Sequence, residues 1–144
     1  MIKVALFAGG NSGEHQISLK TGRNIQDMLD KSQFETYFIV VQGVNWTYTD
    51  DNGLPHNINK EDFSLTIDQQ KIEFDVVFNA LHGDPGENGK LQSYFEMMNI
   101  KYTGCDSFCS ALTFNKYFCN IAVSQFGIPI SPSLHFFKNE AIGF

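Results

Sequence analysis

Short apolar runs alternate with helical repeats of apolar positions in the first part of the chain. Residues 2–8 are apolar or β-favouring and stop at a pair of glycines, which predicts a strand buried on both faces. After a glycine-rich loop to Gly13, apolar positions recur every three to four residues and predict a helix ending near Leu29; they are Ile17, Thr21, Ile25 and Met28. Residues 35–41 predict a second strand, so the segment reads as a parallel βαβ unit.

The middle of the chain, residues 42–70, follows a different pattern. It contains the turn signal Asp50-Asp51-Asn52-Gly53 and alternating apolar and polar residues at 63–67. These features predict short antiparallel strands or hairpins.

Strand and helix patterns return after residue 74. Residues 75–81 predict another buried strand, which runs into a polar loop at 82–89 that contains three glycines. The helix predicted after this loop has its apolar positions at Leu91, Tyr94, Phe95 and Met98. A short strand is predicted at 100–104.

The last part of the chain predicts two helices and one strand. Asp106 or Ser107 is placed to cap a helix that runs through Leu112. A further helix begins at Lys116 and stops at Gly127, and residues 133–137 predict a final strand. The whole pattern predicts an α/β fold with a three-layer open sheet, mostly parallel and Rossmann-like, with a small antiparallel insertion around residues 42–70.

Composition and charge narrow the possible partners. The 144 residues suit one domain, and the net charge of -6 without a basic cluster argues against nucleic-acid binding. No apolar run is long enough to span a membrane, and no signal peptide is visible. The three cysteines have no paired spacing, so we expect free thiols, no metal site and a cytoplasmic protein.

The first glycine-rich loop carries a carboxylate where a phosphate loop would hold an anion. Residues 9–15 lead into a helix N-terminus, which attracts negative charge, but the loop lacks the Lys-Ser/Thr ending of a phosphate loop. Glu14 at this position is suited to bind an ammonium group. The alternative is that Glu14 only complements the helix dipole.

Further candidates lie at the second loop and at the last predicted helix. His82 follows a buried strand directly, and Gly83 beside it leaves space for a ligand. The alternative for His82 is a ring bonded to a backbone carbonyl. Glu87 could pair with a cation, although such residues more often solvate a turn. Lys116 could reach an anionic ligand or only solvent.

Four segments, taken in order, resemble the N-terminal part of the D-alanine:D-alanine ligases, which are members of the ATP-grasp superfamily. They are residues 7–19 (FAGGNSGEHQISL), 79–83 (NALHG), 86–92 (GENGKLQ) and the run from Tyr102-Thr103-Gly104 to Asn115-Lys116. Together with Phe126-Gly127-Ile128-Pro129 they span nearly the whole chain. Gln16, Asn88, Lys90, Ser93 and Asn115 depart from the usual family pattern.

The resemblance implies a pre-ATP-grasp fold and an enzyme that phosphorylates one D-alanine with ATP and joins it to a second D-alanine for peptidoglycan synthesis. Glu14 would be the catalytic residue that binds the first ammonium group. His82 and Gly83 would line the same subsite, with Ser18 among its supporting hydrogen bonds. Lys116 would contact ATP.

The resemblance also implies a division of the chain. Residues 1–112 would form the substrate-binding domain, and residues 113–144 would begin the central ATP-grasp domain. The ligands for magnesium or manganese would lie in a longer parent chain, so the 144 residues alone are expected to be inactive. A homodimer is implied, and the second substrate stays open between D-alanine, D-lactate and D-serine. The alternative is a non-catalytic amino-acid or nucleotide binding module with a Rossmann-like fold.

Overall fold

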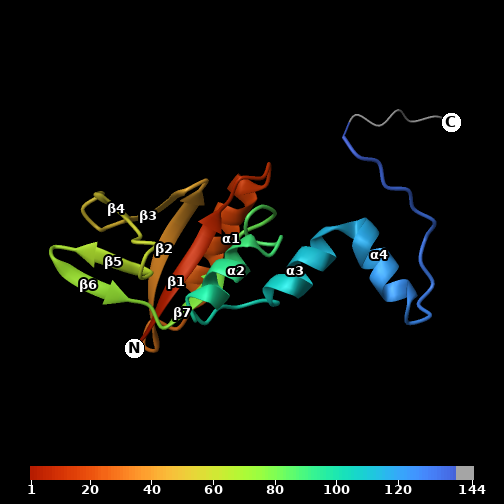
Figure 1. Ribbon diagram of the computed structural model, residues 1–144. Helices are drawn as coiled ribbons and strands as arrows, with labels where there is room; N and C mark the ends of the chain where they lie inside the picture. Colours follow the sequence, from red (N-terminus) through yellow and green to blue (C-terminus); the bar gives the residue numbers. More distant parts are fainter. Residues whose placement is uncertain (139–144) are drawn as a thin grey trace.

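The structure, a computed structural model, describes residues 1–138 and contains one mixed sheet, one hairpin and four helices (Figure 1). The strands are β1 (Ile2–Gly9), β2 (Phe34–Gln42), β3 (Asn45–Thr49), β4 (Pro55–Asn57), β5 (Ser64–Ile67), β6 (Gln70–Glu73) and β7 (Val76–Asn79). The helices are α1 (His15–Met28), α2 (Lys90–Met97), α3 (Ser107–Phe114) and α4 (Lys116–Ser124).

The main sheet is parallel at its centre and antiparallel at one edge. Its five strands lie in the order β4-β3-β2-β1-β7, and β1 pairs in parallel with both β2 and β7. The strands β3 and β4 extend the sheet in antiparallel register, while β5 and β6 form a separate antiparallel hairpin. The structure therefore confirms the predicted parallel βαβ unit and the antiparallel insertion.

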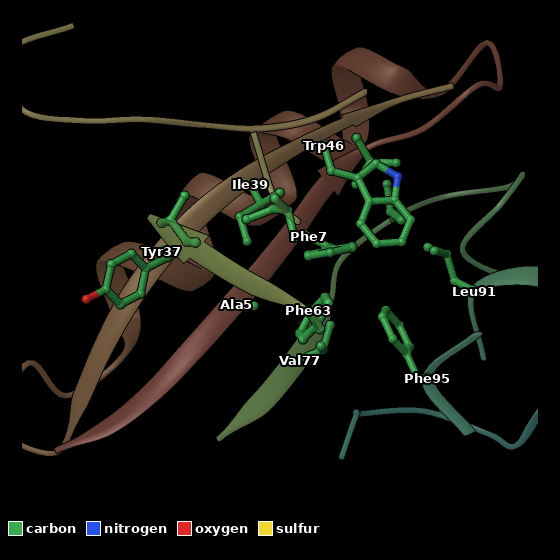
Figure 2. Packing of buried hydrophobic residues seen from close by; sticks show 13 residues of the cluster. Ala5, Phe7, Tyr37, Ile39, Trp46, Phe63, Val77, Leu91 and Phe95 are labelled. Atoms are coloured by element: carbon green, nitrogen blue, oxygen red, sulfur yellow. The ribbon is translucent and has the colours of Figure 1, made fainter. Parts of the chain in front are cut away.

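Alternation along β1 creates two apolar faces and hence three layers. Ala5 and Phe7 belong to a core on one face, which the β5–β6 hairpin and α2 cover. Leu6 and Ala8 point to the opposite face, which α1 covers. In the larger core, the rings of Phe7, Phe63 and Phe95 pack against one another in tilted and edge-to-face arrangements (Figure 2). Burying each such side chain contributes about 1.5–3 kcal/mol to folding.

The buried face of α1 differs from the predicted one. Ser18 and Gly22 are buried, whereas Ile17 is 56% and Met28 is 86% exposed. A Cβ on Gly22 would come within 2.8 Å of the Phe38 ring, so only the smallest residue lets the helix approach the sheet this closely. The apolar period therefore located the helix and half of its contact face correctly, since Thr21 and Ile25 are partly buried, but it placed Ile17 and Met28 on that face wrongly.

The last third of the chain departs further from prediction. Residues 100–104 form only a single parallel bridge, between Val77 and Tyr102. The strand predicted over 133–137 is wrong, because within residues 1–138 no strand pairs with this segment. Both predicted helices are present as α3 and α4, which extend away from the sheet (Figure 1). Residues 139–144 of the predicted second domain lie outside the described residues.

Candidate functional site

The loops that follow β1 and β7 are bonded to each other at the carboxyl ends of these strands. Asn11 donates through its backbone N–H to the Asp84 carbonyl (2.8 Å) and through Nδ2 to Asp84 Oδ2 (2.9 Å). Ser12 Oγ donates to the His82 carbonyl at 2.8 Å. Ligands of open parallel sheets bind at this edge, so the two loops form one candidate site, as the family resemblance implies.

A cavity of about 730 Å³ opens over these loops. Its walls come from the loop after β1, the loop after β7 and the segment from Thr103 to Lys116, and its lining includes Ser12, Glu14, Gly83, Gln92, Thr113 and Lys116. The cavity thus joins elements that lie far apart in the sequence. Three of the five predicted site residues, namely Glu14, Gly83 and Lys116, line it.

Glu14 immediately precedes α1, at the helix N-terminus. Its backbone N–H lies 3.2 Å from Ser12 Oγ, while its carboxylate makes no capping hydrogen bond to the helix. The side chain is exposed and lines the cavity. The helix dipole stabilises a carboxylate beside a helix N-terminus, and this one is placed to receive an ammonium group.

Gly83 forms the wall of the cavity next to Glu14. Its φ of 73° is unfavourable for other residues, and a Cβ would lie 2.7 Å from the Ser12 Cβ and 3.9 Å from Glu14 Oε2. The Gly83 N–H donates to Glu87 Oε2 at 2.8 Å. The glycine therefore lets the two loops close on each other, and Glu87 holds it in place.

The structure places the other two predicted substrate residues outside the cavity lining. The His82 ring lies against α1, with Nε2 3.2 Å from Thr21 Oγ1. Ser18 is fully buried; its Oγ accepts from the Gly9 N–H (2.8 Å) and donates to the Ala80 carbonyl (2.7 Å). Ser18 thus ties together the ends of β1 and β7 and supports the site from beneath.

Lys116 is the first residue of α4. Asn115 caps this helix, because its Oδ1 accepts a hydrogen bond from the Phe118 N–H at 3.2 Å. The lysine is exposed and faces the same cavity as Glu14. It brings a positive charge to a cavity whose other charged lining residues are Glu14, Asp84 and Glu87.

Asp84, which sequence reasoning did not single out, organises the second loop. Hydrogen bonds from Lys90 and then from Asn11 and Asn88 lower the pKa of its carboxyl to about 2. The Lys90 Nζ to Asp84 Oδ1 distance is 2.5 Å. Asp84 therefore stays ionised and fixes the loop shape. Its sequence signal, an acid before proline among glycines, is too general to reveal this role.

The junction between α2 and α3 brings the last wall of the cavity into place. Glu96 on α2 accepts hydrogen bonds from Ser107 N (2.8 Å) and from Tyr102 Oη (2.6 Å). These bonds lower the pKa of Glu96, while burial and then the Glu96 bond raise the pKa of Tyr102 to about 12. The start of α3 is thereby held against α2.

Three further properties concern the described residues as a whole. Among residues 1–138, no cluster of three or more His, Cys, Asp or Glu side chains is arranged to hold a metal ion. All three cysteines are free of disulfides. None of the described helices combines the length and apolarity that crossing a bilayer needs.

The sequence and the fold both match one protein family. The family model described as "D-ala D-ala ligase N-terminus" matches residues 3–105, which include both loops and most of the cavity lining. The chain belongs to this family of D-Ala-D-Ala ligase N-terminal domains. The resemblance seen in the sequence motifs is thereby confirmed.

Individual members of the family show how much of the ligase the chain spans. The D-alanine–D-alanine ligase of Parabacteroides distasonis is 40% identical over 139 residues, which are 96% of this chain and 42% of the relative. The D-alanyl-alanine synthetase A structure from Vibrio cholerae has a TM-score of 0.80 and 30% identity over 91% of this chain and 39% of its own. The chain thus spans about two fifths of the relatives it matches.

A third relative was solved with a nucleotide. The D-alanine–D-alanine ligase of Bacillus anthracis complexed with ATP has a TM-score of 0.74 and 25% identity, covering all of this chain and 43% of its own. The α/β architecture with a mostly parallel central sheet is therefore shared between this chain and the N-terminal parts of solved ligases.

Proposed function

We propose that the chain is the amino-acid-binding part of an ATP-dependent ligase that joins two D-alanine molecules for peptidoglycan synthesis. The observation that carries this proposal is the Glu14 carboxylate, which lies beside Gly83 in a cavity at the carboxyl ends of β1 and β7. Family membership supports it, because the relatives matched over nearly the whole chain bear the name D-alanine–D-alanine ligase.

In the proposed mechanism, Glu14 holds the ammonium group of the first D-alanine. The dipole at the N-terminus of α1 favours a carboxylate at this position, and Gly83 lets the loop after β7 approach Ser12 beside it. Ser18 positions both loops through its bonds to Gly9 and Ala80. His82 lies next to the subsite, and its ring is oriented by Thr21. With the ammonium fixed, the substrate carboxylate projects into the open cavity.

ATP would phosphorylate that carboxylate, and the amine of a second D-alanine would displace the phosphate to form the peptide bond. Lys116, which lines the same cavity, is proposed to contact the phosphates and offset their charge. The ATP bound to the Bacillus anthracis relative supports this cofactor. Among residues 1–138 no group of three or more His, Cys, Asp or Glu side chains is arranged to hold magnesium or manganese, and we place the ligands of that metal in the longer parent chain.

Three further proposals follow the family. Residues 1–112 would form the substrate domain, and residues 113–144 the start of the ATP-grasp domain. We also propose a cytoplasmic homodimer, with the exposed Ile17 and Met28 of α1 as part of its interface. Sedimentation of the chain with Met28→Glu, compared with wild type, tests this interface; equal masses would contradict it.

The activity is tested by measuring ADP release from the entire product of the parent gene with D-alanine or L-alanine. The 144-residue chain is assayed beside it. We expect turnover by the longer chain only, and only with D-alanine. An inert longer chain would support a non-catalytic binding module instead, and ADP formation by the 144 residues alone would contradict the assignment of ATP binding to later residues.

A further inference from the structure

Three loops meet at the side chain of Asn11. The strands β2, β1 and β7 are adjacent and parallel, so their carboxyl ends lie at one edge of the sheet. Asn11 lies in the loop after β1. Its Oδ1 accepts from the Gly43 N–H in the turn after β2 at 2.7 Å, and its Nδ2 donates to Asp84 Oδ2 in the loop after β7 at 2.9 Å. One side chain thus joins the loops that follow all three strands.

The chemistry of these two contacts fixes the orientation of the Asn11 amide. The Gly43 N–H can only donate, and an ionised carboxylate can only accept. The hydrogen bonds of Asp84, the one from Lys90 first, lower the pKa of its carboxyl to about 2, so it is ionised at neutral pH. A half-turn of the amide would set donor against donor and oxygen against oxygen. Asparagine suits this position because its side chain offers an acceptor and a donor side by side.

The loop that Asn11 anchors carries the carboxylate proposed to hold the ammonium group. Asn11 is exposed and lies outside the cavity lining, whereas Ser12, Glu14 and Gly83 line the cavity. Ser12 follows Asn11 directly; its Oγ accepts from the Glu14 N–H at 3.2 Å and donates to the His82 carbonyl at 2.8 Å. The position of Glu14 relative to Gly83 therefore depends on how Asn11 holds the two loops.

The turn after β2 gives Asn11 a support that lies outside the cavity. Gly43 is one of the two residues between β2 and β3, whose pairing ends with Gln42 opposite Asn45. The hydrogen bond from Gly43 therefore ties the loop after β1 to the antiparallel part of the sheet. The bonds between the loops after β1 and β7 alone do not make this connection.

We infer that Asn11 is a positioning residue for the proposed ammonium site, because it holds the loops after β1, β2 and β7 in one fixed arrangement. This inference rests on the proposed function and extends it, since it gives the turn between β2 and β3 a part in substrate binding. Asn11 acts through the loops that carry Glu14 and Gly83 and does not touch the ligand. Its loss should therefore weaken binding of D-alanine more than it slows the chemical step.

Exchanging the two bonded side chains tests this inference. Asn11→Asp sets two carboxylates against each other, and Asp84→Asn sets two Nδ2 groups against each other, so each change alone breaks the contact. With both changes together, the amide at position 84 can donate to the carboxylate at position 11. The outer contacts remain, because Oδ1 at position 11 still accepts from Gly43 and Oδ1 at position 84 still accepts from Lys90.

The KM for D-alanine is measured in the full parent enzyme, for the wild type, both single variants and the double variant. We expect Asn11→Asp to raise KM about tenfold and Asp84→Asn about threefold, with smaller changes in kcat. The double variant should return KM to within about twofold of the wild type. Asn52→Asp makes the same change at another exposed residue, in the turn after β3, and should leave KM unchanged.

Melting temperatures of the same variants of the 144-residue chain distinguish the ways in which the inference can fail. If the exchange restores the melting temperature but neither single change alters KM, the contact is only structural, and the inference is overturned while the proposed function stands. If the two KM effects multiply in the double variant, the contact does not carry them, and the inference is again overturned. If the wild-type parent enzyme releases no ADP with D-alanine, the proposed function fails and the inference fails with it.

Discussion

The region from β1 to α2 and the region from α3 onward use their apolar residues in opposite ways. In the first region, Phe7 and Phe95 are fully buried, with their ring centroids 5.8 Å apart. In the second, Phe126 and Leu134 are each 83% exposed. Among the residues described in α3 and α4, only Ser110 is buried.

This difference shows where the stability of the chain resides. The first region contains the hydrophobic core, and several of its loop glycines leave no space for a Cβ. Its candidate site is therefore held by tightly packed elements. The second region adds Lys116 and one wall of the cavity but little buried apolar surface. Stability changes should therefore be large in the first region and small in the second.

The largest expected difference in stability between the two regions comes from truncating one phenylalanine in each. Phe95→Ala removes a fully buried ring and should lower the free energy of unfolding by about 3–5 kcal/mol. Phe126→Ala removes an exposed ring and should change it by less than about 0.5 kcal/mol. Urea denaturation measures both. Equal losses would show that the second region is packed as tightly as the first.

Replacing two glycines of the site loops by alanine tests how tightly each loop is packed. Gly86→Ala would place a Cβ 2.2 Å from the Leu81 Cβ and should cost about 1–3 kcal/mol through overpacking. At Gly13 nothing lies within 4 Å of a Cβ, so Gly13→Ala should be nearly neutral. Thermal unfolding followed by circular dichroism compares them. An unchanged melting temperature for Gly86→Ala would mean that Gly86 is not packed tightly against Leu81.

Removing the buried hydroxyl of Ser18 tests the joint between β1 and β7. Ser18→Ala leaves the Gly9 N–H and the Ala80 carbonyl without this partner and should cost about 1–2 kcal/mol. Ser93→Ala removes the hydroxyl of an exposed residue, which donates to the carbonyl of Gly89 at the N-cap of α2, and should cost less than about 0.5 kcal/mol. Urea unfolding that ranks the two in the reverse order would contradict the assigned joint.

The smallest expected effect is the pH dependence that Asp84 contributes. Its folded pKa of about 2 lies below the ordinary 3.8, so its contribution is full above 3.8 and is lost as the pH falls toward 2. Asp84→Asn should lower stability by less than about 1 kcal/mol at neutral pH, because the carboxylate is partly exposed. The gap to wild type should narrow in acid; a constant gap would contradict the assigned contacts.

Much of the fold could be predicted because strands buried on both faces and regular helical periods leave clear patterns. The buried strands β1 and β2 and the apolar positions of α2 match those patterns. The contact face of α1 was predicted only in part: Ile25 packs against the core as expected, but the centre of the face depends on Gly22 fitting against Phe38, a tertiary contact. The strand predicted at 133–137 failed because a strand needs a partner that the local pattern does not specify.

The candidate site was predictable where a residue's position along the chain decides its surroundings. Glu14 and Gly83 follow strands at the ligand-binding edge, and they line the cavity. His82 and Ser18 meet other elements, Thr21 of α1 and the Ala80 carbonyl, that the sequence does not place.

The central claim is that Glu14 holds the substrate ammonium group, and the KM for D-alanine tests it most directly. Glu14→Gln and the control Glu61→Gln, an exposed residue before β5, are compared in the full parent enzyme. Replacing the carboxylate by a neutral amide should raise KM at least about tenfold, with Glu61→Gln unchanged. An unaltered KM in Glu14→Gln would contradict the account.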